Sequence, residues 1–325
     1  RTYRHRVMDV WADNLGPAML LMREIAARNA YVILDTEFPG RCLWSDGVLI
    51  SAEDAVYHSI KLNTEVCPCI QFGIAFMDEL CRFDEFVAAF QFNLRFDPTS
   101  DQSAVTAINF LTQHGFSIEK HARRGIKHET LSEMLSTTGV FRCPTKRYIV
   151  FHGCYDVAYT CALVTSSSLP GDLESFMALA SEIVPNLYDV KTLTDMALAS
   201  DIVPNLYDVK TLTDPFDFKC RSLRFLSSAL GIIHEESGHQ SAVDAITTGK
   251  LFQRTIQILY DGKIHRKFRN HISGFQSISH HEKKFIFVPD DMKLTAMVNL
   301  ALLIDTNDPR SMILNNQMNK AHKPA

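Results

Sequence analysis

Residues 31–40 read YVILDTEFPG, and we expect the rest of the chain to be organised around them. Its first four residues are apolar, a pattern typical of a buried strand. Its last two residues are proline and glycine, which end the strand because proline cannot donate a hydrogen bond to a neighbouring strand and glycine turns freely. Asp35 and Glu37 therefore lie at the carboxyl end of the strand.

The spacing of these two acidic residues brings their side chains together. Residues two apart in a strand point to the same face, so both carboxylates project into one small volume. Two anions held so close repel each other unless a proton or a cation lies between them, and hard divalent cations such as Mg2+ prefer carboxylate oxygens. The pair therefore predicts half of a metal site. A solvent-exposed strand end is the alternative, and this stretch alone does not separate the two.

Composition sets broad limits on the class of protein. The chain has 325 residues, of which 46% are hydrophobic, enough for a core in one large domain or two ordinary ones. A formal charge of -4 does not by itself indicate nucleic acid, so such a partner must be held by a local basic groove or by metals. We expect no membrane partner, because no long apolar span or signal peptide is visible.

Two further features concern the compartment and the ends of the chain. The 8 cysteines show no spacing typical of a zinc site, so we expect reduced thiols in a reducing compartment. The first residue is Arg1 rather than Met, from which we expect a fragment or an incomplete gene model.

Hydrophobic periodicity divides the chain into alternating helices and strands. A helix over residues 7–29 leads into the first strand, and strands at 69–78 and 85–96 form an antiparallel hairpin. A further short strand spans 147–151. Apolar residues recur at helical spacing in the segments 101–114, 129–138, 155–164, 223–230 and 238–259. This order predicts an α/β fold in which a mixed central sheet, with one antiparallel strand, is flanked by helices.

A segment of 19 residues occurs twice in tandem, at 177–195 and 196–214. Solenoids need several copies of their repeat, so we interpret the pair as a tandem duplication or an assembly error. Each copy carries the triplet Tyr-Asp-Val, at 188–190 and at 207–209. We predict that one triplet pairs in the sheet and that the other copy forms a poorly packed excursion.

The last 65 or so residues differ in character from the rest. Basic clusters precede a possible strand at 285–288 and an amphipathic helix from about 291 to 304. We therefore divide the chain into a domain over residues 1–260, which contains the duplication at 177–214, and a C-terminal extension over 261–325 of unknown function.

Three more polar residues follow other elements of the predicted sheet. Sites in such sheets gather at the carboxyl ends of strands, and Asp156 follows the strand at 147–151. Asp244 lies on the late helix five residues after His239, so both can face the sheet edge. Taken singly, each has a plainer interpretation, namely a charge at a helix amino terminus, a cap residue and an exposed helix face.

Several motifs together carry a resemblance to a known family. They are D-T-E-F-P-G at 35–40, I-Q-F-G at 70–73, F-Q-F-N at 90–93, F-H-G-C-Y-D at 151–156, Y-D-V-K at 188–191 and H-Q-S-A-V-D at 239–244. In this order they resemble the catalytic deadenylase subunit called the carbon-catabolite-repressor-associated factor, one of the DEDD exonucleases. The similarity covers about residues 7–258.

The resemblance implies a ribonuclease-H-like exonuclease fold over the first domain and a role for each candidate residue. Asp35, Glu37, Asp156 and Asp244 would hold two divalent ions, Mg2+ or Mn2+, and His239 would be the general base. The implied reaction is the 3'-to-5' hydrolysis of mRNA poly(A) tails, with release of AMP.

The resemblance also implies partners and a place in the cell. The substrate would be single-stranded RNA, with Phe38 beside the site as a candidate for base stacking. Other subunits of the eukaryotic deadenylase complex would be protein partners, and mRNA decay in nucleus and cytoplasm would be the setting. Two alternatives are a DNA 3'-to-5' exonuclease with the same residues and a catalytically impaired scaffold subunit of the deadenylase complex.

Overall fold

The computed structural model describes residues 5–43, 52–199, 222–232, 239–260, 262–264 and 266–275. The chain forms two compact units. The first unit holds the central sheet and consists of residues 1–193, 235–249 and 265–279. The second consists of residues 194–234, 250–264 and 280–325, and its described part includes helix α10 (Leu223–Ala229), which Ser222 caps by accepting a hydrogen bond from Phe225 N.

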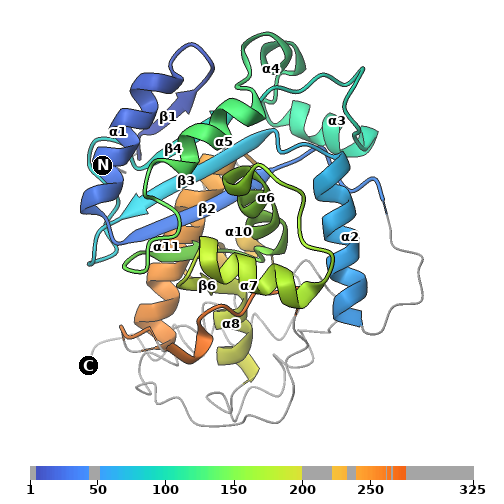
Figure 1. Ribbon diagram of the computed structural model, residues 1–325. Coiled ribbons are helices and arrows are strands. Elements are labelled where there is room, and N and C mark those ends of the chain that lie inside the picture. Colours follow the sequence, from blue (N-terminus) through green and yellow to red (C-terminus); the bar gives the residue numbers. More distant parts are fainter. Residues whose placement is uncertain are drawn as a thin grey trace, which may run out of the picture. The chain divides into compact units, whose positions relative to one another are not determined.

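A sheet of six strands forms the centre of the first unit, in the order β1-β4-β3-β2-β5-β6 (Figure 1). Strand β3 runs antiparallel to β2 and β4, whereas the other neighbouring strands are parallel. This confirms the predicted mixed sheet with one antiparallel strand. The strands are β1 (Val7–Val10), β2 (Tyr31–Glu37), β3 (Gln71–Met77), β4 (Ala89–Asn93), β5 (Arg147–Val150) and β6 (Leu187–Asp189).

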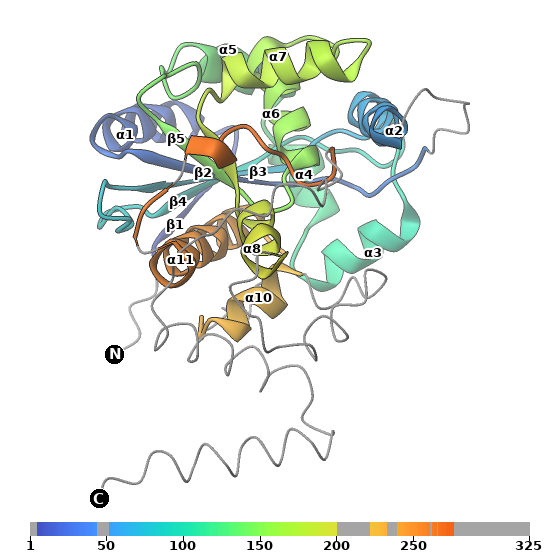
Figure 2. The same cartoon turned by 90° about the horizontal axis from the view of Figure 1, so that it is seen from below.

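Helices cover both faces of this sheet (Figure 2). One face carries the main hydrophobic core, to which α1, α5, α6 and α7 contribute residues such as Met22, Leu131, Val157 and Phe176. The first part of α11 lies against the other face, where Gly249 packs near Ile33 of β2. The helices are α1 (Leu15–Arg28), α2 (Ala52–Val66), α3 (Val105–Gln113), α4 (Ile118–Arg124), α5 (His128–Ser136), α6 (Cys154–Thr165), α7 (Leu173–Ile183), α8 (Val190–Ala199) and α11 (Ser241–Leu259).

Strand β1 corrects the predicted helix over residues 7–29. Val7–Val10 pairs in parallel with β4, and α1 begins only at Leu15. Asn14 separates the two elements, because its side chain accepts a hydrogen bond from Trp11 N at 2.7 Å and donates one to the Asp9 carbonyl at 3.0 Å. A strand of 4 residues is too short for its alternation of inward and outward side chains to be told apart from helical spacing of apolar residues.

Two helices lie in segments for which the sequence predicted no regular element. Helix α2 lies in the polar, mixed stretch after the first strand, and α4 lies in the charged stretch at 119–127. Ser117 caps α4 by accepting a hydrogen bond from Lys120 N, and Glu119 pairs with Arg123 one turn later. Capping and ion pairs stabilise α4, so a search for apolar periodicity overlooks it.

The first copy of the duplicated segment supplies an edge strand of the sheet. Leu187–Asp189 forms β6 and pairs with β5, whereas Val190 already begins α8. The triplet of the second copy, at 207–209, lies outside the described residues, as do the predicted strand at 285–288 and the helix at 291–304.

The predicted domain boundary at residue 260 remains a prediction. Beyond it, however, Ile272 and Phe275 are buried in the core of the first unit. In the parts of the chain that the structure describes, no helix is long and apolar enough to cross a bilayer.

Deleting residues 196–214 tests the interpretation of the repeat. The deletion leaves β6 and its pairing with β5 intact, and surplus loop length costs only about 0.6 kcal/mol of closure entropy per doubling. We expect an equal or higher melting temperature, measured by calorimetry. The nuclease activity that the resemblance implies should be retained, as measured by RNA cleavage. An unfolded deletion variant would show that both copies are built into the core.

Candidate active site

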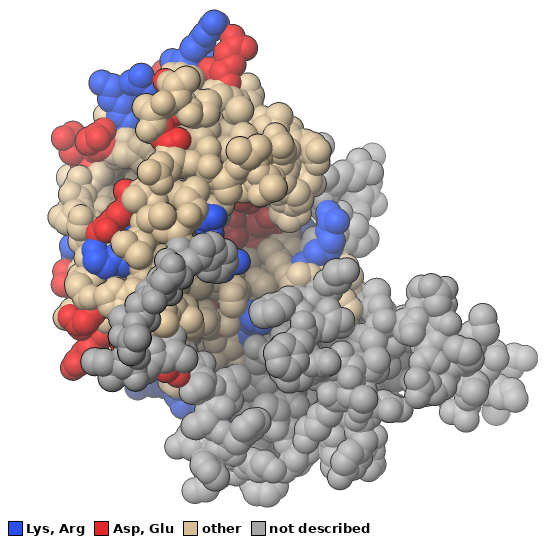
Figure 3. All heavy atoms as spheres, turned by 90° about the vertical axis from the view of Figure 1, so that its right-hand side faces the viewer, with Lys and Arg blue, Asp and Glu red and all other residues tan. Residues whose placement is uncertain are grey.

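The structure brings all five predicted site residues to one end of the sheet. Asp35 and Glu37 come from the end of β2, Asp156 and Asp244 from the first turns of α6 and α11, and His239 from the residues just before α11. Acidic side chains line the base of a hollow on this face of the molecule (Figure 3). The residues that the resemblance selected are therefore neighbours in the fold.

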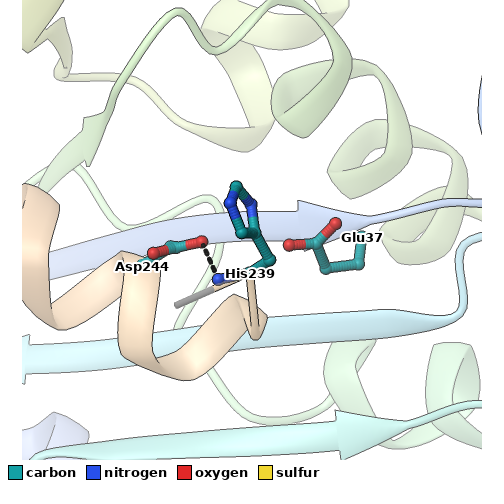
Figure 4. A group of neighbouring side chains, drawn as sticks. All are labelled: Glu37, His239 and Asp244. Atoms are coloured by element: carbon teal, nitrogen blue, oxygen red, sulfur yellow. Dashed lines mark hydrogen bonds between the residues drawn. The ribbon is translucent and has the colours of Figure 1, made fainter. Parts of the chain in front are cut away.

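Glu37, His239 and Asp244 form the tightest group (Figure 4). One ligand atom from each lies within 4.8 Å of the others, close enough to share one cation. His239 has a positive φ of 70°, and its backbone N donates a hydrogen bond to Asp244 Oδ2 at 3.1 Å. This local turn fixes the imidazole relative to the first turn of α11.

Asp156 is held by the same strand that carries the first two carboxylates. Both the backbone N and the Oγ1 of Thr36 donate hydrogen bonds to Asp156 Oδ1, each at 2.7 Å. Thr36 lies between Asp35 and Glu37, so one strand segment supplies two acids and orients a third. Asp156 lies in the first turn of α6, as its plainer interpretation also expects, but it is only 8% exposed and faces the acids of β2.

Burial, together with nearby carboxylates, raises the pKa values of Asp35, Glu37 and Asp156. Burial, then repulsion from the other three acids, raises the pKa of Asp35 well above its usual range. Burial and the nearby carboxylates of Asp244 and Asp156 raise the pKa of Glu37 to about 8. Burial raises the pKa of Asp156 to about 7, although the hydrogen bonds from Thr36 lower it. Such a set of hard oxygen donors fits divalent ions, whose charge relieves the repulsion.

A glycine that the sequence analysis did not select lets α11 approach the sheet. Gly73 pairs with Asp35 in the β2–β3 ladder. A Cβ atom at Gly73 would lie 2.3 Å from the carbonyl C and O of Ser241 and 2.6 Å from Ala242 N. The neighbouring Gln91 accepts a long hydrogen bond of 3.4 Å from Ala242 N through its Oε1. The I-Q-F-G and F-Q-F-N motifs contain these two residues, so the sequence marked both positions. Why a glycine and a glutamine are needed there becomes clear only from their contacts with α11.

Asp189 is a second residue that the sequence analysis did not assign to the site. Its buried carboxylate accepts hydrogen bonds from the backbone N of four residues at 2.9 to 3.0 Å: His152, Gly153, Lys191 and Ser273. Gly153 is the N-cap of α6, the helix that carries Asp156. Asp189 therefore holds the turn that aims Asp156.

The segment 269–275 completes this arrangement from far along the chain. Asn270 N donates to the Leu187 carbonyl at 2.8 Å, and Asn270 Oδ1 accepts from Leu187 N at 3.2 Å, so the segment extends the edge of β6. Its Ile272 and Phe275 are each 2% exposed. These residues lie within the predicted C-terminal extension, yet they belong to the support of the site.

Phe38, predicted to stack on a base, follows Glu37 and is half-buried. Its ring stacks on Tyr155 at 4.7 Å between centroids and lies 5.2 Å from Tyr159. Its role toward a substrate remains a prediction.

Comparison with known proteins identifies the family. The family model described as CAF1 family ribonuclease matches residues 10–138 and 127–252, which is more than half of the chain. The chain belongs to the CAF1 family of ribonucleases.

Individual CAF1 relatives agree with this assignment. The chain is 28% identical over 271 residues to "Poly(A) ribonuclease pop2" of Schizosaccharomyces pombe, covering 83% of this chain and 75% of the relative. The structure of S. pombe Pop2p with Mg2+ and Mn2+ bound matches with a TM-score of 0.74 at 28% identity, covering 82% of this chain and 99% of that one. The fold is therefore the predicted ribonuclease-H-like exonuclease fold.

A yeast complex extends the structural match at lower identity. The structure of the yeast NOT1 MIF4G domain co-crystallised with CAF1 matches with a TM-score of 0.65 at 21% identity, covering 82% of this chain and 96% of that one. At this identity the match supports the fold alone.

Substituting Gly73 tests the close approach of α11. Gly73→Ala should push the start of α11 away from β3, because the added methyl group meets backbone atoms. A misplacement of about 1 Å costs about a hundredfold in rate, so we expect at least that loss in RNA cleavage. The matched control is Gly16→Ala on α1, where a Cβ meets nothing within 4 Å. Equal activity of the two variants would contradict the role of Gly73.

Glu37→Gln tests the electrostatic strain of the metal-free site. The folded-state pKa of Glu37, about 8, exceeds its ordinary value of 4.5. Ionisation of Glu37 therefore lowers the free energy of unfolding, with no effect below pH 4.5 and an increasing effect as the pH rises toward 8. In EDTA the variant should melt above wild type at high pH and together with it at low pH, as measured by calorimetry. Glu133→Gln on the exposed face of α5 is the control, and a pH-independent difference for Glu37→Gln would contradict the assignment.

Proposed function

We propose that this chain is a divalent-metal-dependent 3'-to-5' exoribonuclease that shortens mRNA poly(A) tails and releases AMP. The observation that carries the proposal is the convergence of four carboxylates and His239 at one end of the sheet, in a chain of the CAF1 ribonuclease family. The relative named poly(A) ribonuclease supports poly(A) as the substrate.

Asp35, Glu37, Asp156 and Asp244 would hold two ions, Mg2+ or Mn2+. When bound, the ions polarise the phosphate and stabilise the charge that develops on the attacking and leaving oxygens. Support for these metals comes from S. pombe Pop2p, whose structure contains both of them. The carboxylates come from three separate elements, so they can surround the ions rather than line one side.

His239 would act as the general base. A neutral imidazole takes a proton from the attacking water as the water oxygen bonds to phosphorus and the bond to the 3'-oxygen of the preceding nucleotide breaks. The preceding nucleotide keeps its 3'-oxygen, which takes up a proton, and the terminal nucleotide leaves as AMP. The hydrogen bond from His239 N to Asp244 supports this role, because it holds the base beside a metal ligand.

We extend the proposal to partners and location. The chain would work in mRNA decay, in nucleus and cytoplasm, together with other subunits of the deadenylase complex. The co-crystal structure of a CAF1 with a NOT1 MIF4G domain supports a partner of this type. Co-purification with tagged chain and imaging of its location in cells test these two statements.

A cleavage assay with three variants tests the activity. Wild type should shorten a 5'-labelled A-tailed RNA in Mg2+ and leave the matched DNA largely intact. Asp35→Ala and Asp244→Ala should abolish shortening while the proteins remain folded, because each removes only a metal ligand. His239→Ala should lose about a hundred- to ten-thousandfold in rate.

The outcomes separate the alternatives. Equal rates on RNA and DNA would favour a DNA exonuclease, and an inactive wild type that is folded would favour the scaffold. Wild-type turnover by either aspartate variant would contradict the metal assignment.

A further inference from the structure

Helix α3 forms one wall of the site, and its first turn packs against the turn that follows Glu37. Gly40 has a φ of 87°, and a Cβ there would lie 2.6 Å from Ala107 Cβ and 3.0 Å from Ala104 Cβ. The backbone N of Ala104 also donates to the Pro39 carbonyl at 2.8 Å. The amino-terminal end of α3 is thus tied to the strand end that carries two of the carboxylates.

The other end of α3 packs against the general base. The ring of His239 lies 4.6 Å from that of Phe110 and 4.8 Å from that of His114, both in edge-to-face geometry. The His114 carbonyl also accepts a hydrogen bond from Gln240 Nε2 at 3.5 Å. Ala107, Phe110 and His114 are three and four residues apart, so one face of α3 runs along the site from Glu37 to His239.

Phe110 stands out on this face because the residue is 42% exposed. The nearby Phe116 and Phe96, in contrast, pack on each other in a small core and are at most 6% exposed. A tilted contact with His114, at 4.3 Å between centroids, and the edge-to-face contact with His239 hold the Phe110 ring. Together they leave much of the residue accessible beside the reacting groups. A rigid, exposed aromatic ring is a surface on which a nucleobase of a single strand can stack.

We propose that the ring of Phe110 is a stacking platform for one of the last three bases at the RNA 3' end. The proposal rests on the proposed function, since it assumes that a single-stranded RNA enters the site. Stacking on Phe110 would place the backbone of the bound strand along the face of α3, between the carboxylates and His239. Phe110 would thereby contribute to the affinity for the strand, whereas His239 would contribute to the rate.

The experiment combines ring substitutions with abasic RNA. Binding of a fluorescently labelled A-tailed RNA is measured by anisotropy in an Asp35→Ala background, so that affinity is read without cleavage. Phe110→Ala should weaken binding about 5- to 150-fold, the range for loss of one stacked base. Phe110→Leu keeps an apolar contact to His239 but has no aromatic face, so it should weaken RNA binding to a similar extent. Phe110→Trp, which has an aromatic face, should bind the RNA about as tightly as the protein with Phe110.

Abasic nucleotides at each of the last three positions identify the base. In the Asp35→Ala protein, one abasic position should weaken binding as much as Phe110→Ala does. In the protein that also carries Phe110→Ala, the same abasic position should cause no further loss of affinity. Phe86→Ala is the matched control, because Phe86 is 67% exposed and lies in the loop between β3 and β4, where it contacts Arg28. It should leave the affinity unchanged.

Turnover measurements with Asp35 intact complete the test. Phe110→Leu should raise KM and leave kcat within a few fold of wild type. A fall in kcat at unchanged KM would mean that Phe110 only positions His239. In the binding assay, equal sensitivity of the proteins with and without Phe110→Ala to every abasic position would mean that no base stacks on Phe110. Either result overturns the proposal. An inactive wild type that still shows the binding pattern would refute the proposed function and leave the stacking site standing.

Discussion

Four carboxylates converge at one end of the sheet, and the fold must hold them there against desolvation and charge repulsion. Burial and neighbouring carboxylates raise the pKa values of Asp35 and Glu37, and burial and Asp189 raise that of Asp156, so the site is unfavourable until protons or divalent ions relieve the repulsion. The surrounding fold must hold the acids against this force. It does so through backbone contacts. Thr36 N donates a hydrogen bond to Asp156 and His239 N donates one to Asp244, and Gly73, which has no side chain, lets the start of α11 pack closely on β3.

Asp189 shows a different way to bury a carboxylate in the same neighbourhood. Burial raises the pKa of Asp189, but its oxygens accept hydrogen bonds from four backbone N–H groups, which favour the charged form and oppose this rise. Asp156 is bound differently, because both of its hydrogen bonds from Thr36 fall on one oxygen, Oδ1. Asp189 therefore supports the backbone around it, whereas the clustered acids are suited to bind cations.

The sequence predicted the parts of this molecule that depend on local pattern. Apolar runs located the inner strands, and the D-x-E spacing placed two carboxylates on one face of β2. The five site residues could be selected because their motifs resemble a family, although each alone had a plainer interpretation. The assignment of β1 to a helix failed because four residues carry too little periodicity, and α4 was missed because a cap and ion pairs stabilise it. The reason for Gly73 and the role of Asp189 depend on contacts with residues 241 and 273, which no local pattern reveals.

The four donors to Asp189 differ in when they become available. His152 and Gly153 precede Asp189 by 37 and 36 residues and Lys191 follows it by 2, whereas Ser273 lies 84 residues downstream. Because synthesis proceeds from the amino terminus, the ribosome delivers all four clustered carboxylates before it delivers the last donor of the turn that holds Asp156. A chain that ends after Asp244 but before Ser273 therefore contains these acids without the final support for their geometry.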